Sequence, residues 1–271
     1  MQLDTCSLLK NCLLFITCNL VLISCGTLEN GHSWGEDTSL FPSTHRLSQA
    51  ATISAQHPAT WAPLLGATLF SIANLDEDIS RRLADNNPVF GSKQEANDAS
   101  DLLRDSLVAS VVVSALATPG GDTASEQFTN KSKGLITEFA ALEITAVATS
   151  QIKRASGRER PNAINNSSFP SGHTSRAFAA AALTSKNLDS LSLTSGTATG
   201  IRVGLYTFAA GTALARVEAE MHYTTDVMVG AALGNFLSRF IHDAFLGLDN
   251  NNQIQLNIAP KFTSAQLKLV F

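Results

Sequence analysis

The chain has 271 residues, of which 44% are hydrophobic and 15% are charged, and its formal net charge at neutral pH is −4. This length suits one domain of ordinary size, alone or with an appendage. The slight acidity and the lack of a long basic run argue against a nucleic-acid partner, although a cleft can still be locally basic. All four cysteines lie in the first 25 residues, so the body of the protein has no disulfide framework.

Residues 1–24 are predicted to be a signal peptide. Their apolar core, Leu13 to Ile23, is shorter than the roughly 20 apolar residues that a transmembrane helix needs. The segment ends in LISC, which resembles a bacterial lipobox. The resemblance implies that Cys25 is the lipid-modified mature N-terminus. It also implies a periplasm-facing lipoprotein of the bacterial cell envelope, anchored in the outer membrane. Plain secretion and an uncleaved anchor are the alternatives.

Residues 26–58 are mixed and polar, and they are predicted to form a tether whose histidines (His32, His45 and His57) face solvent. From residue 59 to residue 248 the chain is a series of alanine-rich apolar segments, whose length and composition favour helices over strands. Clusters of Gly, Pro and Asn separate these segments. The candidate helices are Ala62–Ala73, Ala99–Leu116, Lys133–Lys153, Ser175–Leu183, Gly200–Glu218 and Thr225–Leu246.

The predicted fold is therefore an all-α helical bundle. None of its segments is a clean run of about 20 strongly apolar residues, which favours a compact domain that is soluble or lies against a bilayer. Two or three true membrane spans are the alternative. Four glycines inside helical segments predict close approach between helices: Gly204, Gly211, Gly230 and Gly234. Residues 249–271 alternate apolar and polar side chains on either side of Pro260, which predicts a small C-terminal β-hairpin.

The stretch SSFPSGHTS stands directly before an alanine-rich helix. Ser171 is a natural N-cap, and the first turn after it offers unpaired N–H groups and the positive end of the helix dipole. Gly172 lets the backbone approach a ligand closely. His173 lies in this first turn, where the charge of a bound anion would raise its pKa and suit it to donate a proton.

Two further patches carry complementary chemistry. His222 and Asp226 are four residues apart, so that on a helix they share a face and the carboxylate can orient the imidazole as a nucleophile. Lys153 and Arg160 belong to a patch at the end of an apolar helix, and Arg216 lies six residues before His222. Arg binds phosphate through two parallel hydrogen bonds and Lys adds a point charge. The set suits a transferring phosphoryl group, which needs positioning and charge neutralisation.

The three patches resemble the signature of the type 2 phosphatidic acid phosphatase superfamily, which includes bacterial class A acid phosphatases and vanadium haloperoxidases. The signature reads Lys-x6-Arg-Pro, then Pro-Ser-Gly-His, then Ser-Arg-x5-His-x3-Asp, and it runs here from Lys153 to Asp226. The resemblance covers about residues 133 to 246. Ala215 stands where the family usually has serine, so any hydroxyl contact at that position is lost.

The resemblance implies a bundle of the phosphatidic acid phosphatase and haloperoxidase kind over residues 59–248. It also implies the residue roles: His222 attacks phosphorus, Asp226 orients His222, and His173 protonates the leaving oxygen. No metal or cofactor is required. The residues that bind the phosphoryl oxygens are Lys153, Arg160, Ser171, Gly172 and Arg216. The expected function is hydrolysis of a phosphomonoester, or of a lipid phosphate or pyrophosphate, outside the cytoplasm.

Two alternatives stay open from the sequence. In a vanadate-dependent haloperoxidase the same site would hold vanadate, with His222 as its ligand. A non-catalytic envelope lipoprotein would keep the fold alone. Arg154 and Arg158 lie outside the signature and are expected to be solvated or to aid substrate approach. No role is assigned to Asp189, Glu218, Glu220 or His242.

Overall fold

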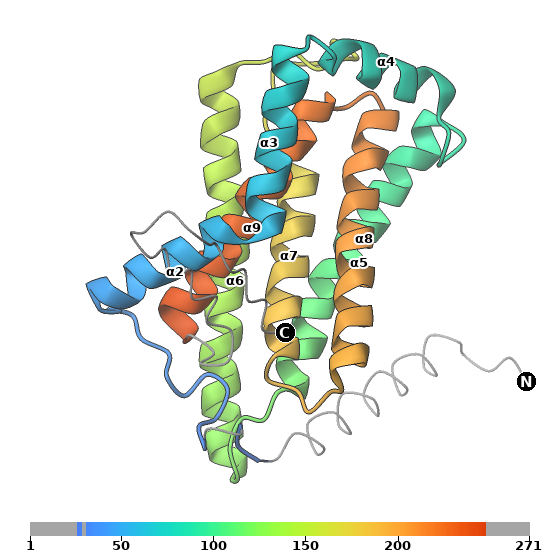
Figure 1. The fold of residues 1–271 in the computed structure, drawn as a ribbon. Helices are drawn as coiled ribbons and strands as arrows, with labels where there is room; N and C mark the ends of the chain where they lie inside the picture. The colour runs from blue at the N-terminus through green and yellow to red at the C-terminus, as the bar shows by residue number, and fades with distance from the viewer. Residues whose placement is uncertain (1–25, 29–30, 248–271) are drawn as a thin grey trace, which may run out of the picture.

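The structure is a computed structural model, and it describes residues 26–28 and 31–247. Eight α-helices, which end in one π-helical turn, make up the described part (Figure 1). Its only β-type contact is an isolated bridge between Gly26 and Gly121. The all-α prediction is thus confirmed, whereas residues 1–25, with Cys25, and the predicted hairpin at 249–271 lie outside the described residues. The helices are α2 (Thr44–Gln56), α3 (Pro58–Ile72), α4 (Asp76–Asn86), α5 (Lys93–Ala117), α6 (Ala124–Ser156), α7 (Gly172–Leu188), α8 (Ser195–Glu218) and α9 (Thr224–Ile241), followed by the π-turn His242–Leu246.

Helix α7 is the centre of the bundle, with α5, α6, α8 and α9 packed around it. Almost every residue from Thr174 to Leu188 is buried. Its alanine run, residues 177–182, keeps the helix thin enough for neighbours on several sides, and Phe178 and Leu183 fill the core that remains. A helix that is buried all round needs such small side chains, because long ones would hold its neighbours apart.

Helix α9 approaches α7 most closely, at two glycines. A Cβ on Gly230 would lie 2.7 Å from the carbonyl oxygen of Ser171, and one on Gly234 would lie 2.1 Å from that of Ser175. Both distances are below any real Cβ contact, so only glycine allows the two backbones to meet. The predicted close approach is confirmed at these two positions. Gly204, in contrast, has open space around it.

The segment 26–58 differs from the expected tether. It contains helix α2, which packs against α9, and the side chain of Trp34 is buried. Only Ala50 and Ser54 of α2 are buried, and such small residues give little apolar periodicity to detect in the sequence. His57, expected in solvent, instead caps α3 by accepting the N–H of Ala59 at 3.2 Å. Burial lowers its pKa to about 3.

Helix α4 is the second element that the sequence analysis missed. Its sequence DEDISRRLADN is mostly charged, and it buries only Ser80 and Ala84. Its acidic first turn suits a helix N-terminus.

One helix in the described part, α6, is long and apolar enough to cross a membrane, with a mean hydropathy of 1.2 over its best window and 33% of that window buried inside the bundle. Core helices of soluble proteins reach the same values.

The contact between α7 and α9 gives a first prediction. Gly234→Ala places a methyl group against the Ser175 carbonyl, so we expect it to lower the free energy of unfolding by about 1–3 kcal/mol. Gly204→Ala is the matched control, because it adds the same methyl group in open space and raises helix propensity by up to about 1 kcal/mol. Denaturant unfolding of both variants measures the difference, and equal stabilities would contradict the close contact.

Candidate active site

The three sequence patches meet at one end of the bundle. Helices α6 and α8 end there, and α7 and α9 begin there. The Ser171 N–H donates to the Asp226 carbonyl at 3.0 Å, which joins the first turns of α7 and α9. After α8 the chain reverses tightly, and the N–H groups of Met221 and His222 both donate to the Arg216 carbonyl, at 3.1 and 3.2 Å. This turn places His222 directly beside Arg216, which lies in the last turn of α8.

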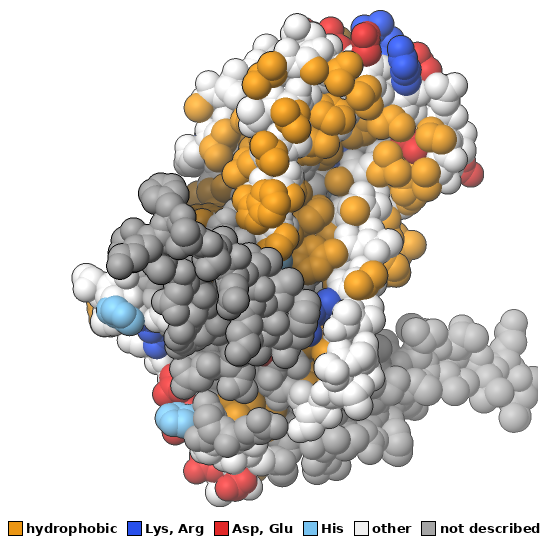
Figure 2. All heavy atoms as spheres, in the orientation of Figure 1, with side chains coloured by type: hydrophobic (Ala, Val, Ile, Leu, Met, Phe, Trp, Pro, Cys, Tyr) orange, Lys and Arg blue, Asp and Glu red, His pale blue; other side chains and the backbone are white. Residues whose placement is uncertain are grey.

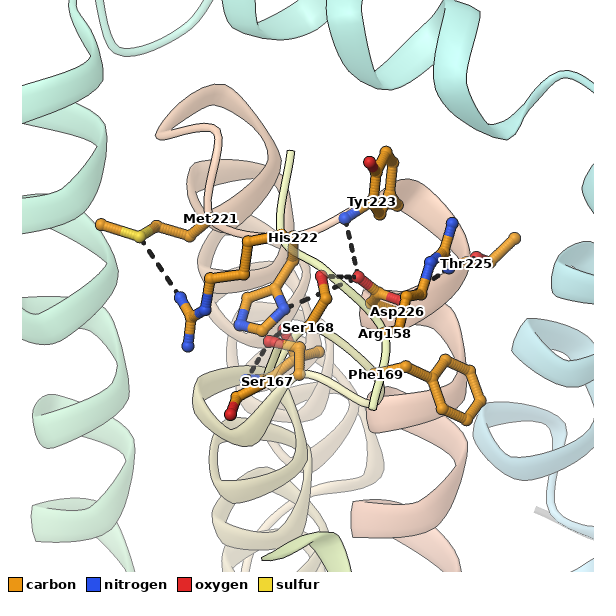
Figure 3. A network of polar contacts seen from close by, with 12 residues as sticks. Arg158, Ser167, Ser168, Phe169, Met221, His222, Tyr223, Thr225 and Asp226 are labelled. Atoms are coloured by element: carbon orange, nitrogen blue, oxygen red, sulfur yellow. Dashed lines mark hydrogen bonds and ion pairs between the residues drawn. The ribbon is translucent and has the colours of Figure 1, made fainter. Parts of the chain in front are cut away.

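His222 and Asp226 face each other inside the protein (Figure 3). The side chain of His222 is 1% exposed, and its Nδ1 lies 3.7 Å from Asp226 Oδ2, slightly beyond hydrogen-bond length. The same Oδ2 accepts the Tyr223 N–H at 2.9 Å and the Ser168 hydroxyl. Since Nδ1 is the nitrogen that faces the carboxylate, Nε2 is the nitrogen left for a substrate.

Burial sets the protonation of this pair. Burial, helped by the charges of Lys153 and Arg216 and opposed by Asp226, lowers the pKa of His222 to about 4. Burial alone would raise the pKa of Asp226, but the neighbouring His222 and Ser168 and the charge of Arg158 outweigh it and hold that pKa below its ordinary value. At neutral pH the pair is therefore a neutral imidazole beside a carboxylate, the state that a nucleophile requires.

His173 has a carboxylate of its own. Its Nε2 lies 2.8 Å from Oδ1 of Asp101, which also pairs with Arg104 at 2.9 Å. Burial and then Arg216 lower the pKa of His173 to about 4, against the opposing effect of Asp101. A bound phosphate would offset the charge of Arg216 and raise that pKa. Asp101 comes from α5, 72 residues earlier in the chain, so no local sequence signal marks it.

Three cationic side chains adjoin the histidines. Lys153 Nζ donates to the Ser167 carbonyl at 2.7 Å, and Arg160 Nε donates to Asn165 Oδ1 at 2.9 Å. Burial and then Arg160 lower the pKa of Lys153 to about 8. Burial and then Arg160 also lower the pKa of Arg216 to about 10. Because Arg160 acts on both other cations, the three lie close enough to repel one another.

The guanidinium of Arg216 is only partly satisfied by protein acceptors. Its side chain is buried, and it donates through one terminal nitrogen to Asn97 Oδ1 at 2.7 Å and to Ser100 Oγ at 3.2 Å. Its Nε is buried with no hydrogen-bond partner. A buried guanidinium nitrogen without an acceptor is costly, and an anion between the three cations would provide one.

Ser171 and Gly172 occupy the start of α7 as expected. The Ser171 hydroxyl caps the helix, accepting from the Thr174 N–H at 3.4 Å and from the Thr174 hydroxyl at 3.0 Å. The Ser171 N–H is already used by Asp226, so only its hydroxyl proton is left for a ligand. The Gly172 N–H belongs to the first helical turn and has no acceptor within the helix. A Cβ on Gly172 would lie 3.9 Å from Cε of Lys153, so the glycine lies beside the Lys153 side chain.

Arg158 was expected to be solvated or to aid substrate approach, but the structure shows it bound to protein carboxylates. Its guanidinium donates to Asp226 Oδ1 at 2.8 Å and stacks 4.0 Å from the centre of the Tyr223 ring (Figure 3). Glu218 also has a structural place, because its carboxylate accepts the N–H groups of Val89 and Phe90 and anchors the loop before α5. Both side chains reach partners more than 60 residues away, which the local pattern does not show.

Ala215, the departure from the family signature, is completely buried. In the part of the chain that the structure describes, no group of three or more His, Cys, Asp or Glu side chains is arranged to hold a metal ion. The site is therefore a set of two imidazoles, two carboxylates and three cations at the end of a helical bundle, the composition of an oxyanion-binding site.

Comparisons with known proteins agree with this class. Residues 132–247 match the model of the PAP2 superfamily. The lipid A 1-phosphatase of Porphyromonas gingivalis is 32% identical over 102 residues, which are 38% of this chain and 22% of that protein. The match thus spans about a fifth of the relative's length. A transmembrane PAP2-type phosphatidylglycerolphosphate phosphatase of Bacillus subtilis has a similar fold, with a TM-score of 0.51 and 19% identity over 73% of this chain and 94% of that chain. The helical core of the chain, residues 132–247, is thus similar to the PAP2 superfamily.

The buried histidine gives a second prediction. We expect the His222 imidazole to stay neutral as the pH falls through 6.5, the ordinary pKa, and to gain a proton only near pH 4. Histidine NMR titration, with assignment by a His222→Gln variant, measures this directly. A His222 signal that titrates near pH 6.5 would contradict the buried, cation-flanked position.

Proposed function

We propose that the protein is a metal-independent phosphatase that hydrolyses a lipid phosphate or pyrophosphate through a phosphohistidine. The single observation that carries the proposal is the buried Nε of Arg216, left without an acceptor beside two further cations and the neutral His222. A tetrahedral phosphoryl group supplies the missing acceptors. We assign its binding to Lys153, Arg160, Arg216, the Ser171 hydroxyl and the Gly172 N–H.

In the first chemical step, Nε2 of His222 attacks phosphorus and the bond from phosphorus to the ester oxygen breaks. Asp226 stabilises the positive charge that develops on the ring, from the Nδ1 side. His173 gives its proton to the departing oxygen, so that an alcohol or a phosphate leaves rather than an alkoxide. The cations hold the equatorial oxygens and neutralise their charge.

In the second step, water attacks the phosphohistidine and the bond between phosphorus and nitrogen breaks. His173 left the first step without its proton, and it now takes one from the attacking water. Inorganic phosphate leaves, and both histidines return to their starting states. Asp101 holds the His173 ring during both transfers through its contact with Nε2.

The surface favours a lipid as the carrier of the phosphate. Figure 2 shows hydrophobic side chains gathered over α3 and α8. The C-terminal ends of α3 and α8 both lie at the site. Lipid acyl chains that lay along these two helices would therefore place the phosphate of their headgroup at the cations. The two relatives, a lipid A 1-phosphatase and a phosphatidylglycerolphosphate phosphatase, are by name phosphatases of lipid phosphates. The exposed large apolar residues of the two helices are Trp61, Leu64, Leu65, Leu69 and Ile72 on α3, and Ile201, Val203 and Phe208 on α8.

We further propose that the protein works at the bacterial cell envelope. A lipid-modified Cys25 would hold the domain at the membrane and bring its apolar face to the lipid surface. Both the lipid anchor and the outer-membrane location rest on the lipobox-like sequence LISC alone. Palmitate labelling of the protein expressed in a bacterium tests the anchor, since Cys25→Ser removes the label if Cys25 carries it.

A phosphate-release assay tests the proposed activity. We expect the purified protein to release phosphate from lipid phosphates in detergent micelles, and His222→Ala to lose at least about a thousand-fold of that activity. His173→Ala should lose about 10²- to 10⁴-fold on esters with poor leaving groups. His45→Ala is the control, because His45 is exposed and distant in sequence from the site. Bromide oxidation with vanadate and peroxide, without phosphate release, would overturn the proposal in favour of a haloperoxidase.

The lowered pKa of Lys153 predicts the alkaline limb of the pH profile. Lys153 binds phosphate only as the cation, and with a pKa of about 8 it loses its charge above that pH. We expect kcat/KM to fall as the pH rises through 8. Lys153→Arg keeps the charge at every accessible pH, so this fall should disappear from its profile. An unchanged alkaline limb in an active Lys153→Arg enzyme would show that another group causes it.

A further inference from the structure

Arg158 sits between two carboxylates from different parts of the chain. One terminal nitrogen of its guanidinium donates to Asp226 Oδ1 at 2.8 Å, and the other donates to Asp76 Oδ2 at 2.8 Å. The Asp226 side chain is fully buried, that of Asp76 is 13% exposed and that of Arg158 is 31% exposed, so water reaches the arginine but hardly reaches the two carboxylates. The planar guanidinium fixes both carboxylates in one geometry, which a lysine ammonium does not do.

The backbone places Arg158 for this role. Gly157 ends α6 in the left-handed conformation, with φ of 56°, and turns the chain away from the helix axis. The Ser168 N–H then donates to the Arg158 carbonyl at 2.9 Å, while the Ser168 hydroxyl contacts the Asp226 carboxylate. The same short segment therefore holds both oxygens of Asp226, Oδ1 through Arg158 and Oδ2 through Ser168.

Asp76 accepts from the second terminal nitrogen of the Arg158 guanidinium and also binds the start of α9. It is the first residue of α4, and its carboxylate accepts the Thr225 N–H at 2.8 Å and the Thr225 hydroxyl at 2.6 Å. Thr225 directly precedes Asp226 in the first turn of α9. Arg158 also donates to the Thr225 hydroxyl at 2.9 Å. Helix α4 is thereby tied to the turn that carries the carboxylate partner of His222.

We propose that Arg158, braced by Asp76, is a positioning residue that holds the Asp226 carboxylate ionised and aligned on His222. Arg158 uses both terminal nitrogens on protein carboxylates, so it acts on the reaction through Asp226 and not by binding phosphate. With Oδ1 held by Arg158, the carboxylate cannot rotate, and Oδ2 stays toward Nδ1 of His222. This inference rests on the proposed function, because it assigns Arg158 a part in that reaction.

The proposal predicts a change in the acid limb of the pH profile of kcat/KM. Removing the charge of Arg158 raises the pKa of Asp226, and a protonated Asp226 no longer stabilises a positive His222 ring. The acid limb of kcat/KM should then move to higher pH. The other titratable and charged groups that face the pair are unchanged by the substitution: Asp76 from α4, Lys153 from α6, Arg160 from the following loop, Arg216 from α8 and Tyr223 before α9.

Two variants of Arg158 test the role. We expect Arg158→Ala to lower kcat by about 10- to 100-fold with little change in KM, the effect of losing a charge-assisted hydrogen bond outside the phosphate site. Arg158→Lys should return the acid limb to its original pH while kcat stays below that of the wild type. Arg154→Ala, an exposed arginine four residues earlier, is the matched control and should leave both quantities unchanged. Circular dichroism confirms that each variant is folded.

A double-mutant cycle with Asp226 decides whether Arg158 acts through it. In an Asp226→Ala background, Arg158→Ala should cost no further activity, because the carboxylate that it positions is gone. The inference would be overturned if the activity losses of the two single variants multiplied in the double variant. It would also be overturned if the main effect of Arg158→Ala were a rise in KM. The proposed function is tested separately: an inactive wild type sinks that proposal, whereas an active wild type with an unchanged Arg158→Ala pH profile sinks only this one.

Discussion

The backbone of α9 lies directly on the backbone of α7, and the site depends on this contact. Gly230 faces the Ser171 carbonyl and Gly234 faces the Ser175 carbonyl, at distances that leave no room for a side chain. The contact brings the first turns of both helices together, so that Ser171 donates to the Asp226 carbonyl. His173 and Asp226, which are 53 positions apart in the chain, come together at one site because α9 has glycines where it touches the backbone of α7.

Burial gives this constellation its chemistry. The protein has a net charge of −4, yet three cations lie together at the site, where burial lowers the pKa of each and Arg160 further lowers those of Lys153 and Arg216. Burial also keeps His222 neutral and so available as a nucleophile. A bound oxyanion would offset the charge of these desolvated cations, as the proposed function requires. The local charge at the site is thus opposite to the net charge of the chain.

The features that could be predicted from the sequence are those marked by residues close together in the chain. Caps, turns and alanine-rich periodicity located six helices, and the motif spacing located the groups that meet at the site. The Ser171 cap marked the start of α7, but its C-terminal end was missed, because its last turns bury polar residues whose partners come from other helices. The Asn187 side chain donates to the Ser114 hydroxyl oxygen, and Lys186 forms an ion pair with Asp243. Long-range pairs of this kind leave no periodic signal.

The same limit explains the residues missed at the site. Arg158 and Asp101 act on the two motif histidines or their partners from outside the signature, and only the folded chain shows what they contact. Helix α4 was missed because its buried face consists of small side chains, yet it supplies the Asp76 carboxylate. The supporting contacts of a site are therefore harder to predict than the groups that they support.

Trapping the covalent intermediate tests the central claim most directly. p-Nitrophenyl phosphate has a leaving group that needs no proton, so His173→Ala should still transfer its phosphate to His222, while the second step, which uses His173 as a base, becomes slow. Rapid mixing should then give a burst of about one equivalent of nitrophenol per enzyme, as expected for an accumulating covalent intermediate. Mass spectrometry should find acid-labile phosphate on the peptide that contains His222. A burst with the phosphate on any other residue, or turnover that releases phosphate without a burst, would contradict the account.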